Sequence, residues 1–200
     1  RLIHRCLPFL LKHIDAVASN SIETIDALRE IQDNTRYVYV RNSVKIHHGK
    51  RKRPHEVKPS RLVFIGRLCL QKQPMLALRI LESVIRIVPV TLDVYGDGDQ
   101  LIKLERYAYR HNLPVTFHGH QNATADLLLQ YDLMLVTSLY EGFPNVILEA
   151  GAVALPVAST NFQSGATELL SSDRGLLISN NPKDAARAVA ELMHDAAGLK

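Results

Sequence analysis

The sequence predicts an α/β fold, a doubly wound parallel Rossmann-like sheet preceded by a remnant of another domain. From Arg61 onward, apolar runs of four to six residues alternate with helical segments six times, the pattern of strand–helix–strand units that form a parallel sheet. An apolar content of 46% and a charged content of 22% are ordinary for a folded chain of 200 residues. Glycines and charged residues follow several of the apolar runs, at the sheet edge where ligands bind in such folds.

The predicted elements after Arg61 follow from this alternation. Strands are expected at Leu62–Ile65, Thr91–Tyr95, Val115–His118, Leu133–Val136, Pro156–Ser159 and Leu176–Ile178. Helices are expected near Pro74–Val88, Asp99–His111, Ala123–Gln130, Asn145–Val153, Gly165–Leu170 and Pro182–Ala196.

Residues 1–44 are interpreted as the remnant. Residues 2–12 resemble the end of a helix, Asp15–Asn20 a short strand, and Tyr37–Val40 a second strand. Between them Ser21 is a candidate cap for a helix in which Ile22, Ile25, Leu28 and Ile31 recur at helical spacing. A unit of this size cannot bury its own faces, so we expect it to belong to a preceding domain.

Residues 45–60 are predicted to be a basic linker, followed by the ligand-binding domain at 61–200. Lys50, Arg51, Lys52 and Arg53 crowd together in it with three histidines, and Pro54 and Pro59 interrupt the chain. Such a run is typical of an extended, solvated segment. Peripheral attraction to an anionic membrane or to an acidic acceptor is the alternative. Nucleic acid is disfavoured because no aromatic residues interleave with the cations.

Length and cysteine usage limit the class further. No apolar run approaches the roughly 18 residues that a spanning helix needs. Cys6 and Cys69 are too few for a disulfide framework, which fits a reducing compartment. Since the sequence begins at Arg1 with no initiator Met, we expect it to be an excerpt of a longer protein. The expected location, in line with the reducing compartment, is the cytoplasm or the cytoplasmic face of the membrane.

The stretch LVTSLYEGFPNVILEAGAVALPVA, residues 135–158, is the strongest candidate site. A strand is followed by a turn with Glu141 and then by a helix from Asn145 that is apolar except at Glu149. A lone carboxylate in an apolar helix is expected at a pocket mouth or in an ion pair. The helix N-terminus would follow the carboxyl end of a strand, a position suited to anions.

Two further strand ends supply candidate binding groups. Gly66 permits close backbone approach, and Arg67 with Lys72 would suit a diphosphate, although exposed basic pairs are also common in loops. Gly96 and Gly98 resemble the start of a dinucleotide fingerprint, but Leu101 occupies the position of its third glycine.

His118 and His120 lie two positions apart, with Gly119 between them. They could share a metal, but no third ligand stands at a recognised spacing. His120 could instead face a nucleotide or acceptor, or both could be ordinary surface residues. No metal and no cofactor are expected.

Together these motifs resemble the carboxy-terminal domain of retaining glycosyltransferases with the GT-B fold, of the group 1 or family 4 type. The resemblance rests on Gly66-Arg67-Leu68 with Lys72, Gly96-x-Gly98, Phe117-x-Gly119, the Glu141-Gly142-Phe143-Pro144 turn, Glu149-Ala150 and Pro156-Val157, and it covers about Leu62 to Ala190. Gln73 stands where a glycine is usual, and Gln163–Glu168 replaces a double-glycine turn.

The resemblance implies a role for each residue. Arg67, Lys72 and Glu141 would be catalytic, the two cations holding the donor diphosphate and Glu141 the sugar. The other donor-binding residues would be Gly66, Gly98, Gly119, Gly142, Phe143, Pro144, Asn145, Val146 and Glu149, with Glu149 accepting from the ribose hydroxyls. The amino-terminal remnant would belong to the acceptor domain.

The activity that this implies is sugar transfer, with retention, from a nucleotide sugar to a glycan or lipid-linked acceptor. A UDP-sugar is favoured over a GDP-sugar, and surface polysaccharide or glycolipid synthesis is the expected setting. A sugar-nucleotide epimerase of the same fold and a non-catalytic nucleotide-binding module remain alternatives.

Overall fold

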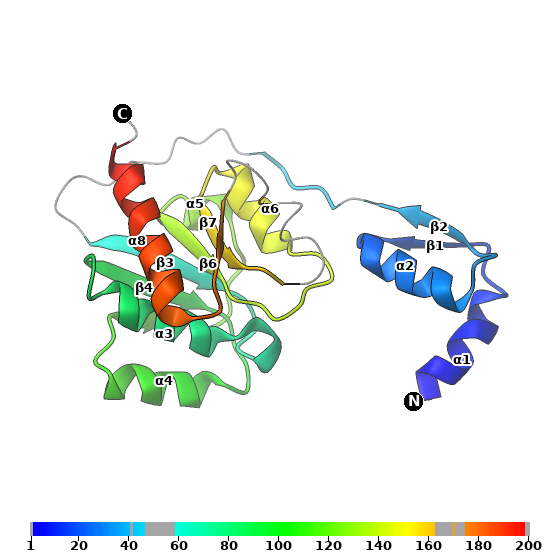
Figure 1. Ribbon diagram of the computed structural model, residues 1–200, viewed down its shortest axis with the longest axis horizontal. Coiled ribbons are helices and arrows are strands. Elements are labelled where there is room, and N and C mark those ends of the chain that lie inside the picture. Colours follow the sequence, from blue (N-terminus) through cyan, green and yellow to red (C-terminus); the bar gives the residue numbers. More distant parts are fainter. Residues whose placement is uncertain (1, 41, 47–58, 163–169, 171–174, 199–200) are drawn as a thin grey trace.

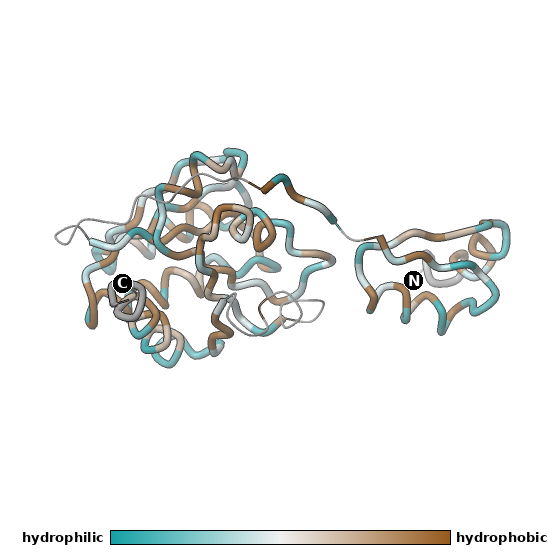
Figure 2. Tube along the Cα trace, turned by 90° about the horizontal axis from the view of Figure 1, so that it is seen from above, coloured by the Kyte–Doolittle hydropathy of each residue, from teal (hydrophilic) through white to brown (hydrophobic). Residues whose placement is uncertain are grey.

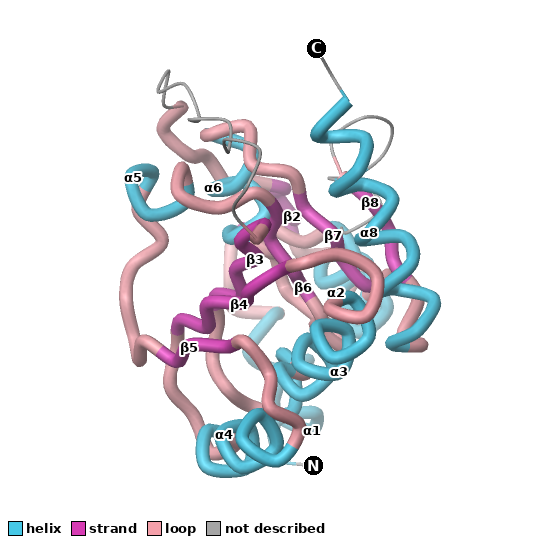
Figure 3. The backbone as a smooth tube through the Cα atoms, turned by 90° about the vertical axis from the view of Figure 1, so that its left-hand side faces the viewer, coloured by secondary structure: helices cyan, strands magenta, loops and turns pink. Residues whose placement is uncertain are grey.

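The computed structural model describes residues 2–40, 42–46, 59–162, 170 and 175–198. Within this part of the chain there are two parallel sheets, one with two strands and one with six (Figure 1). The first sheet pairs β1 with β2, and the second has the order β5-β4-β3-β6-β7-β8, which Figure 3 shows from left to right. This is the strand order of a doubly wound nucleotide-binding sheet, so the predicted fold class is confirmed.

The two-stranded unit precedes the larger sheet. It comprises α1 (Leu2–Leu11), β1 (Ala16–Ser19), α2 (Ile22–Ile31) and β2 (Arg36–Tyr39). Ser21 caps α2 as predicted, because its Oγ accepts a hydrogen bond from the backbone N–H of Thr24 at 3.1 Å. Phe9 and Val40 are 67% and 51% exposed, so this unit leaves large apolar side chains uncovered. Figure 2 shows it as a separate mass joined to the rest by a single segment.

The larger unit places helices on both faces of its sheet. Its strands are β3 (Ser60–Ile65), β4 (Val90–Tyr95), β5 (Val115–Phe117), β6 (Leu133–Val136), β7 (Val157–Thr160) and β8 (Leu176–Ile178). Its helices are α3 (Pro74–Val84), α4 (Leu101–Arg110), α5 (Ala125–Leu128), α6 (Asn145–Ala152) and α8 (Pro182–Gly198), with a short 3-10 turn η1 at Leu70–Lys72.

Alternating side chains of the strands build one apolar core on each face. Leu62 and Phe64 of β3 pack in the core that α3, α4 and α8 cover, whereas Val63 packs in the core that α5 and α6 cover. Figure 1 shows α3 and α4 below the sheet and α5 and α6 above it. Because both faces are covered, the strands are continuous apolar runs, which is why the sequence revealed them.

The predicted strands and helices of the larger unit agree with the structure within a few residues wherever it describes them. Helix α3 ends at Val84 rather than Val88, and α5 is limited to Ala125–Leu128, because helix ends are set by capping and packing more than by periodicity. The 3-10 turn η1 was not predicted. Three predicted segments lie outside the described residues: residues 165–169 of the helix predicted at Gly165–Leu170, the turn residues Gln163–Glu168 and most of the basic linker. The proposed domain limits remain predictions.

Strand order brings two loops together that are distant in sequence. β3 pairs with β4 on one side and with β6 on the other, so the loops that follow β3 and β6 leave the sheet at neighbouring positions. This is the topological switch point, where a crevice forms at the carboxyl ends of the strands. Among the described residues, no helix combines the length and apolar character needed to cross a bilayer.

Candidate functional site

A pocket of about 570 Å³ opens at the carboxyl edge of the larger sheet. It is formed by the loops after β3, β4, β5 and β6 together with the start of α6. Its lining residues are Ile65, Gly66, Arg67, Lys72, Tyr95, Gly96, Asp97, His120, Gln121, Asn122, Ala123, Glu141, Phe143, Pro144, Asn145, Val146 and Glu149. All three predicted catalytic residues and most of the predicted donor-binding residues therefore line one cavity.

One end of the pocket holds an ion pair. The Nζ of Lys72 lies 2.5 Å from Oε1 of Glu141, and the hydroxyl of Ser138 donates to the same carboxylate oxygen. Glu141 is only 7% exposed, so its charge is stabilised by these two donors rather than by water. The ammonium has three N–H donors, of which Glu141 occupies one, so Lys72 can also bind an anion in the pocket.

The backbone around Lys72 is held by the neighbouring strand. The hydroxyl of Thr137, at the end of β6, lies 3.0 Å from the carbonyl oxygen of Lys72 and 2.9 Å from that of Gln73, and it bridges the two as a shared donor. Gln73 adopts a left-handed conformation with φ of 45° and ψ of 51°. This conformation favours glycine, which is the residue usual at this position in the resembled pattern, and Gln73 adopts it in spite of its Cβ.

Arg67 lies at the exposed rim beside this ion pair. Its guanidinium donates to Oε1 of Gln71 at 3.1 Å, and the side-chain amide of Gln71 donates to the carbonyl oxygen of Tyr140 at 3.0 Å. Through Gln71, the loop after β3 is tied to the loop after β6. The pocket therefore presents two cations in different surroundings, Arg67 exposed to solvent and Lys72 in an ion pair.

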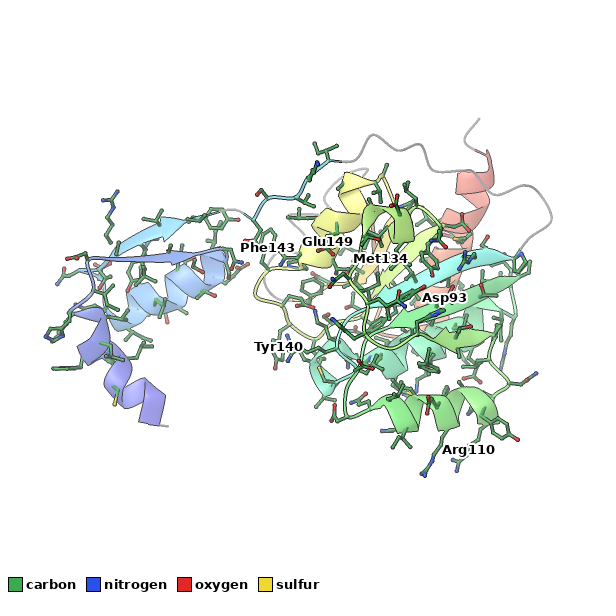
Figure 4. The ribbon with its side chains drawn as sticks, turned by 180° about the vertical axis from the view of Figure 1, so that it is seen from behind. Asp93, Arg110, Met134, Tyr140, Phe143 and Glu149 are labelled. Carbon is green, nitrogen blue, oxygen red and sulfur yellow. The ribbon has the colours of Figure 1, made fainter. Side chains whose placement is uncertain are left out.

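Glu149 occupies the other end of the pocket. It lies one turn into α6, partly buried, and among the described residues its carboxylate makes no ion pair and no hydrogen bond. Burial raises the pKa of Glu149 above its ordinary value because the charged form loses solvation. Figure 4 shows Glu149 and Phe143 on the side of the larger unit that faces the N-terminal unit.

The first turn of α6 separates the two acids. Pro144 precedes the helix and Asn145 begins it, and both line the pocket. The N–H groups at a helix N-terminus carry partial positive charge, which adds to the charges of Arg67 and Lys72. The cavity is therefore suited to an anionic ligand with hydroxyl groups near the two carboxylates.

Three of the predicted donor-binding glycines are not among the lining residues: Gly98, Gly119 and Gly142. A Cβ on Gly98 would meet the carbonyl oxygen of Leu68 at 2.4 Å, so the loop after β4 packs against the loop after β3. Gly119 has a φ of 70°, and its carbonyl accepts from the N–H of Gly96 at 2.7 Å. Gly98 and Gly119 thus lie in loops whose neighbouring residues Asp97 and His120 line the pocket, and direct contact of the glycines with a ligand stays a prediction.

The two histidines have different surroundings. Nε2 of His118 lies 2.6 Å from Oδ1 of Asp93, and its ring stacks on Tyr95 at 4.4 Å, so His118 belongs to the sheet face. Burial by itself raises the pKa of Asp93, but hydrogen bonds from His118 and Arg61 outweigh burial and lower it. His120 lines the pocket, which agrees with the interpretation that it faces a ligand. The described residues contain no cluster of metal-ligating side chains, and the expectation of a metal-free site remains a prediction.

Sequence reasoning missed part of the wall. Gln121, Asn122 and Ala123 line the pocket, but their loop has no motif of its own. The only signal was its place after a predicted strand, at the edge where the other loops gather.

The fold and pocket define a doubly wound α/β domain with a crevice at its switch point, lined by Arg67 and Lys72. The family model described as glycosyl transferases group 1 matches residues 59–195, and the chain belongs to this family. The resemblance inferred from the motifs is thereby confirmed.

Individual relatives agree with this membership. An uncharacterized glycosyltransferase of Methanocaldococcus jannaschii is 34% identical over 53% of this chain and 27% of its own length. The lipopolysaccharide core biosynthesis glycosyltransferase LpsE of Rhizobium meliloti is 29% identical over 58% of this chain and 35% of its own length. The chain thus spans about a third or less of the full length of these two relatives.

A solved structure matches almost the whole chain. TarM from S. aureus, in a complex that includes UDP, superposes with a TM-score of 0.84 and 22% identity, covering 98% of this chain and 40% of TarM. At this level of identity the match shows the fold, which extends through the two-stranded unit as well as the larger sheet.

Proposed function

We propose that the protein is a retaining glycosyltransferase that moves a sugar from a nucleotide diphosphate sugar to an acceptor hydroxyl. The observation that carries the proposal is the single pocket in which Arg67, Lys72, Glu141 and Glu149 converge around the start of α6. Two cations and a helix N-terminus suit a diphosphate, and two carboxylates suit the hydroxyls of a ribose and a sugar.

The residues then have separate tasks. Arg67 and Lys72 bind the diphosphate and stabilise the negative charge that develops on the departing nucleotide, work that a metal does in other transferases. Glu141, fixed by Lys72 and Ser138, accepts hydrogen bonds from hydroxyls of the transferred sugar. Glu149 accepts from the ribose, which supplies the hydrogen bonds that its carboxylate lacks in the described part of the chain.

A UDP-sugar is the favoured donor, and a cell-surface glycan or glycolipid is the favoured acceptor. Support comes from the UDP complex of TarM and from the lipopolysaccharide core pathway named for LpsE. Phe143 and Glu149, which line the pocket, lie on the side facing the two-stranded unit (Figure 4), so an acceptor would enter between the two units. The cytoplasmic location and any peripheral contact with an anionic membrane stay predictions.

Calorimetric titration with UDP, GDP and their sugars tests the donor assignment. We expect binding of one nucleotide and of its sugar derivative without added metal and in the presence of a chelator. Absence of binding to all of them, in a sample that unfolds cooperatively, would overturn the assignment. The anomeric configuration of the product, determined by NMR, tests retention.

A further inference from the structure

Three asparagine side chains form a hydrogen-bonded chain between the two units. Asn20 follows β1, Asn42 lies in the segment after β2, and Asn145 begins α6. The side-chain amide of Asn20 donates to Oδ1 of Asn42 at 3.1 Å, and the amide of Asn42 donates to Oδ1 of Asn145 at 2.5 Å. The second contact joins residues 103 positions apart in the sequence.

The chain runs in one direction. Each asparagine side chain has one carbonyl oxygen and one NH₂ group, so a chain of three amides can run head to tail in either of two senses. In the sense found here, the carbonyl of Asn145 is occupied by Asn42. Among the described residues its NH₂ group makes no hydrogen bond, so both donors remain for a ligand.

Asn145 lies between two cavities. It lines the main pocket of about 570 Å³ and also a smaller one of about 260 Å³, which is bounded by Asn42, Ser43 and Val44 on one side and by Leu148 and Glu149 on the other. We call the smaller cavity the linker pocket. The segment after β2 therefore packs against α6 at the point where the helix meets the main pocket.

The direction of the chain matters for an anionic ligand. With Asn42 donating, Asn145 can turn an NH₂ group to the main pocket, in line with the positive charge of Arg67, Lys72 and the helix N-terminus. If the chain ran in the opposite sense, Asn145 would present a carbonyl oxygen, which repels phosphate oxygens. Because Asn42 donates a hydrogen bond to Oδ1 of Asn145, the group that Asn145 can present to the main pocket is its NH₂ group and not its oxygen.

We propose that Asn42 is a positioning residue of the donor site, which holds the Asn145 amide with its NH₂ group available to the phosphate-bearing ligand. This inference rests on the proposed function and deepens it. It also assigns a role to the segment between the two units, because Asn20 ties the end of β1 to the same chain. Occupation of the Asn145 NH₂ group by the ligand would strengthen the other two hydrogen bonds, since hydrogen bonds in series polarise one another.

Asn42→Asp is the decisive variant. A carboxylate has the same shape as the amide but only accepts hydrogen bonds, so Asn145 would have to donate its NH₂ group to position 42 and turn its oxygen toward the ligand. Ser43→Asp is the matched control, because it places the same charge in the same linker pocket without touching the amide chain. Asn42→Ala removes the chain without adding charge.

The readout is the calorimetric affinity for UDP and for uridine, which lacks the phosphates, with GDP and guanosine used if the protein selects guanine. We expect Asn42→Asp to weaken UDP at least tenfold more than Ser43→Asp does, and Asn42→Ala to weaken it by about threefold to tenfold. Uridine affinity should change by less than about twofold in each variant, because the nucleoside lacks the group that the Asn145 amide would contact.

Two results would overturn the inference. Equal losses in Asn42→Asp and Ser43→Asp would mean that only added charge matters, and parallel losses for UDP and uridine would mean that Asn42 has a merely structural role. Cooperative unfolding of each variant shows that it is folded, and Asn42→Ala decides the matter if Asn42→Asp fails to fold. If the unmodified protein binds none of these nucleotides, the proposed function itself is wrong.

Discussion

The two acidic ends of the pocket differ in how their charge is stabilised. Glu141 is almost fully buried, yet its carboxylate receives the ammonium of Lys72 and the hydroxyl of Ser138. Glu149 is more open to solvent, yet no described residue donates to it, and burial raises its pKa. The Glu141 carboxylate is thus supplied with donors by the protein itself, whereas under the proposed function the donors to Glu149 come from the ligand.

This difference indicates how the two ends contribute to binding. A satisfied ion pair gives a fixed geometry, which suits the sugar that must be held for transfer. A carboxylate without hydrogen-bond donors gains more from ligand hydroxyls, because no existing bond has to be broken. We therefore expect Glu141 to matter more for folding and for the sugar, and Glu149 more for nucleotide affinity.

The largest effect is expected for Glu141→Ala. It leaves the ammonium of Lys72, whose side chain is 19% exposed, without its counter-ion. Loss of one partner from a largely buried pair should lower the free energy of unfolding by about 3 kcal/mol, measured by urea denaturation. Lys72→Met with Glu141→Ala should recover part of that loss. Purely additive losses in the double variant would show that the two charges do not stabilise each other.

Glu149→Ala tests the other end through affinity. We expect UDP and UDP-sugar binding to weaken by a similar factor of about 10 to 100, the equivalent of a charged hydrogen-bonding group. Glu141→Gln is the matched comparison and should weaken the sugar nucleotide more than free UDP. If both variants affected UDP and UDP-sugar to the same degree, the two ends would not have separate roles.

A smaller effect is expected in the pH dependence of stability. Because the folded-state pKa of Glu149 is raised from 4.5, the folded protein holds this proton more tightly than the unfolded chain does. The stability that Glu149 contributes is therefore lost as the pH rises from the pKa of this group in the unfolded chain through its raised pKa in the folded protein. Glu149→Gln should become more stable than the unmodified protein by about 1 kcal/mol over that range, with little difference below pH 4.5.

Urea unfolding of the unmodified protein and of Glu149→Gln, measured side by side from about pH 4 to about pH 8, gives the difference in free energy of unfolding at each pH. Only groups whose pKa changes on folding make this free energy depend on pH. A stability gain of Glu149→Gln that stays constant over the whole pH range would contradict the prediction, because a constant gain would reflect packing and not charge.

The smallest effect concerns the backbone that carries Lys72. Gln73→Gly should raise the free energy of unfolding by about 0.5 kcal/mol, because relief of a left-handed conformation outweighs the greater freedom of glycine in the unfolded chain. Gln73→Ala keeps the Cβ and serves as the control, with no expected gain. Equal stabilisation by both substitutions would show that the side chain, and not the backbone conformation, is responsible.

Much of the fold could be predicted because its determinants are local. Strands buried on both faces are continuous apolar runs, so β6 at Leu133–Val136 and β8 at Leu176–Ile178 were placed to the residue. The cap at Ser21 and the start of α6 after Pro144 also depend on neighbouring residues alone. The 3-10 turn η1 was missed, because it is held by tertiary hydrogen bonds from Thr137 to the carbonyl oxygens of Lys72 and Gln73.

The candidate site divides in the same way. Arg67, Lys72, Glu141 and Glu149 could be selected because each follows a strand or lies alone in an apolar helix. The part of the pocket wall formed by Gln121–Ala123 could not be selected from the sequence, because its loop has no distinctive composition. Gly98, Gly119 and Gly142 were selected as donor-binding residues, and the structure places them outside the lining of the pocket.

Local sequence patterns specify the class of fold, the strand ends and the charged residues that follow them, because periodicity and turn chemistry act over a few residues. Which of these residues meet depends on the tertiary structure. Lys72 pairs with Glu141 over 69 positions because β3 lies beside β6, and Asn42 meets Asn145 over 103 positions because the segment after β2 packs on α6. Strand order and packing between units are set by the whole core, and no local pattern contains them.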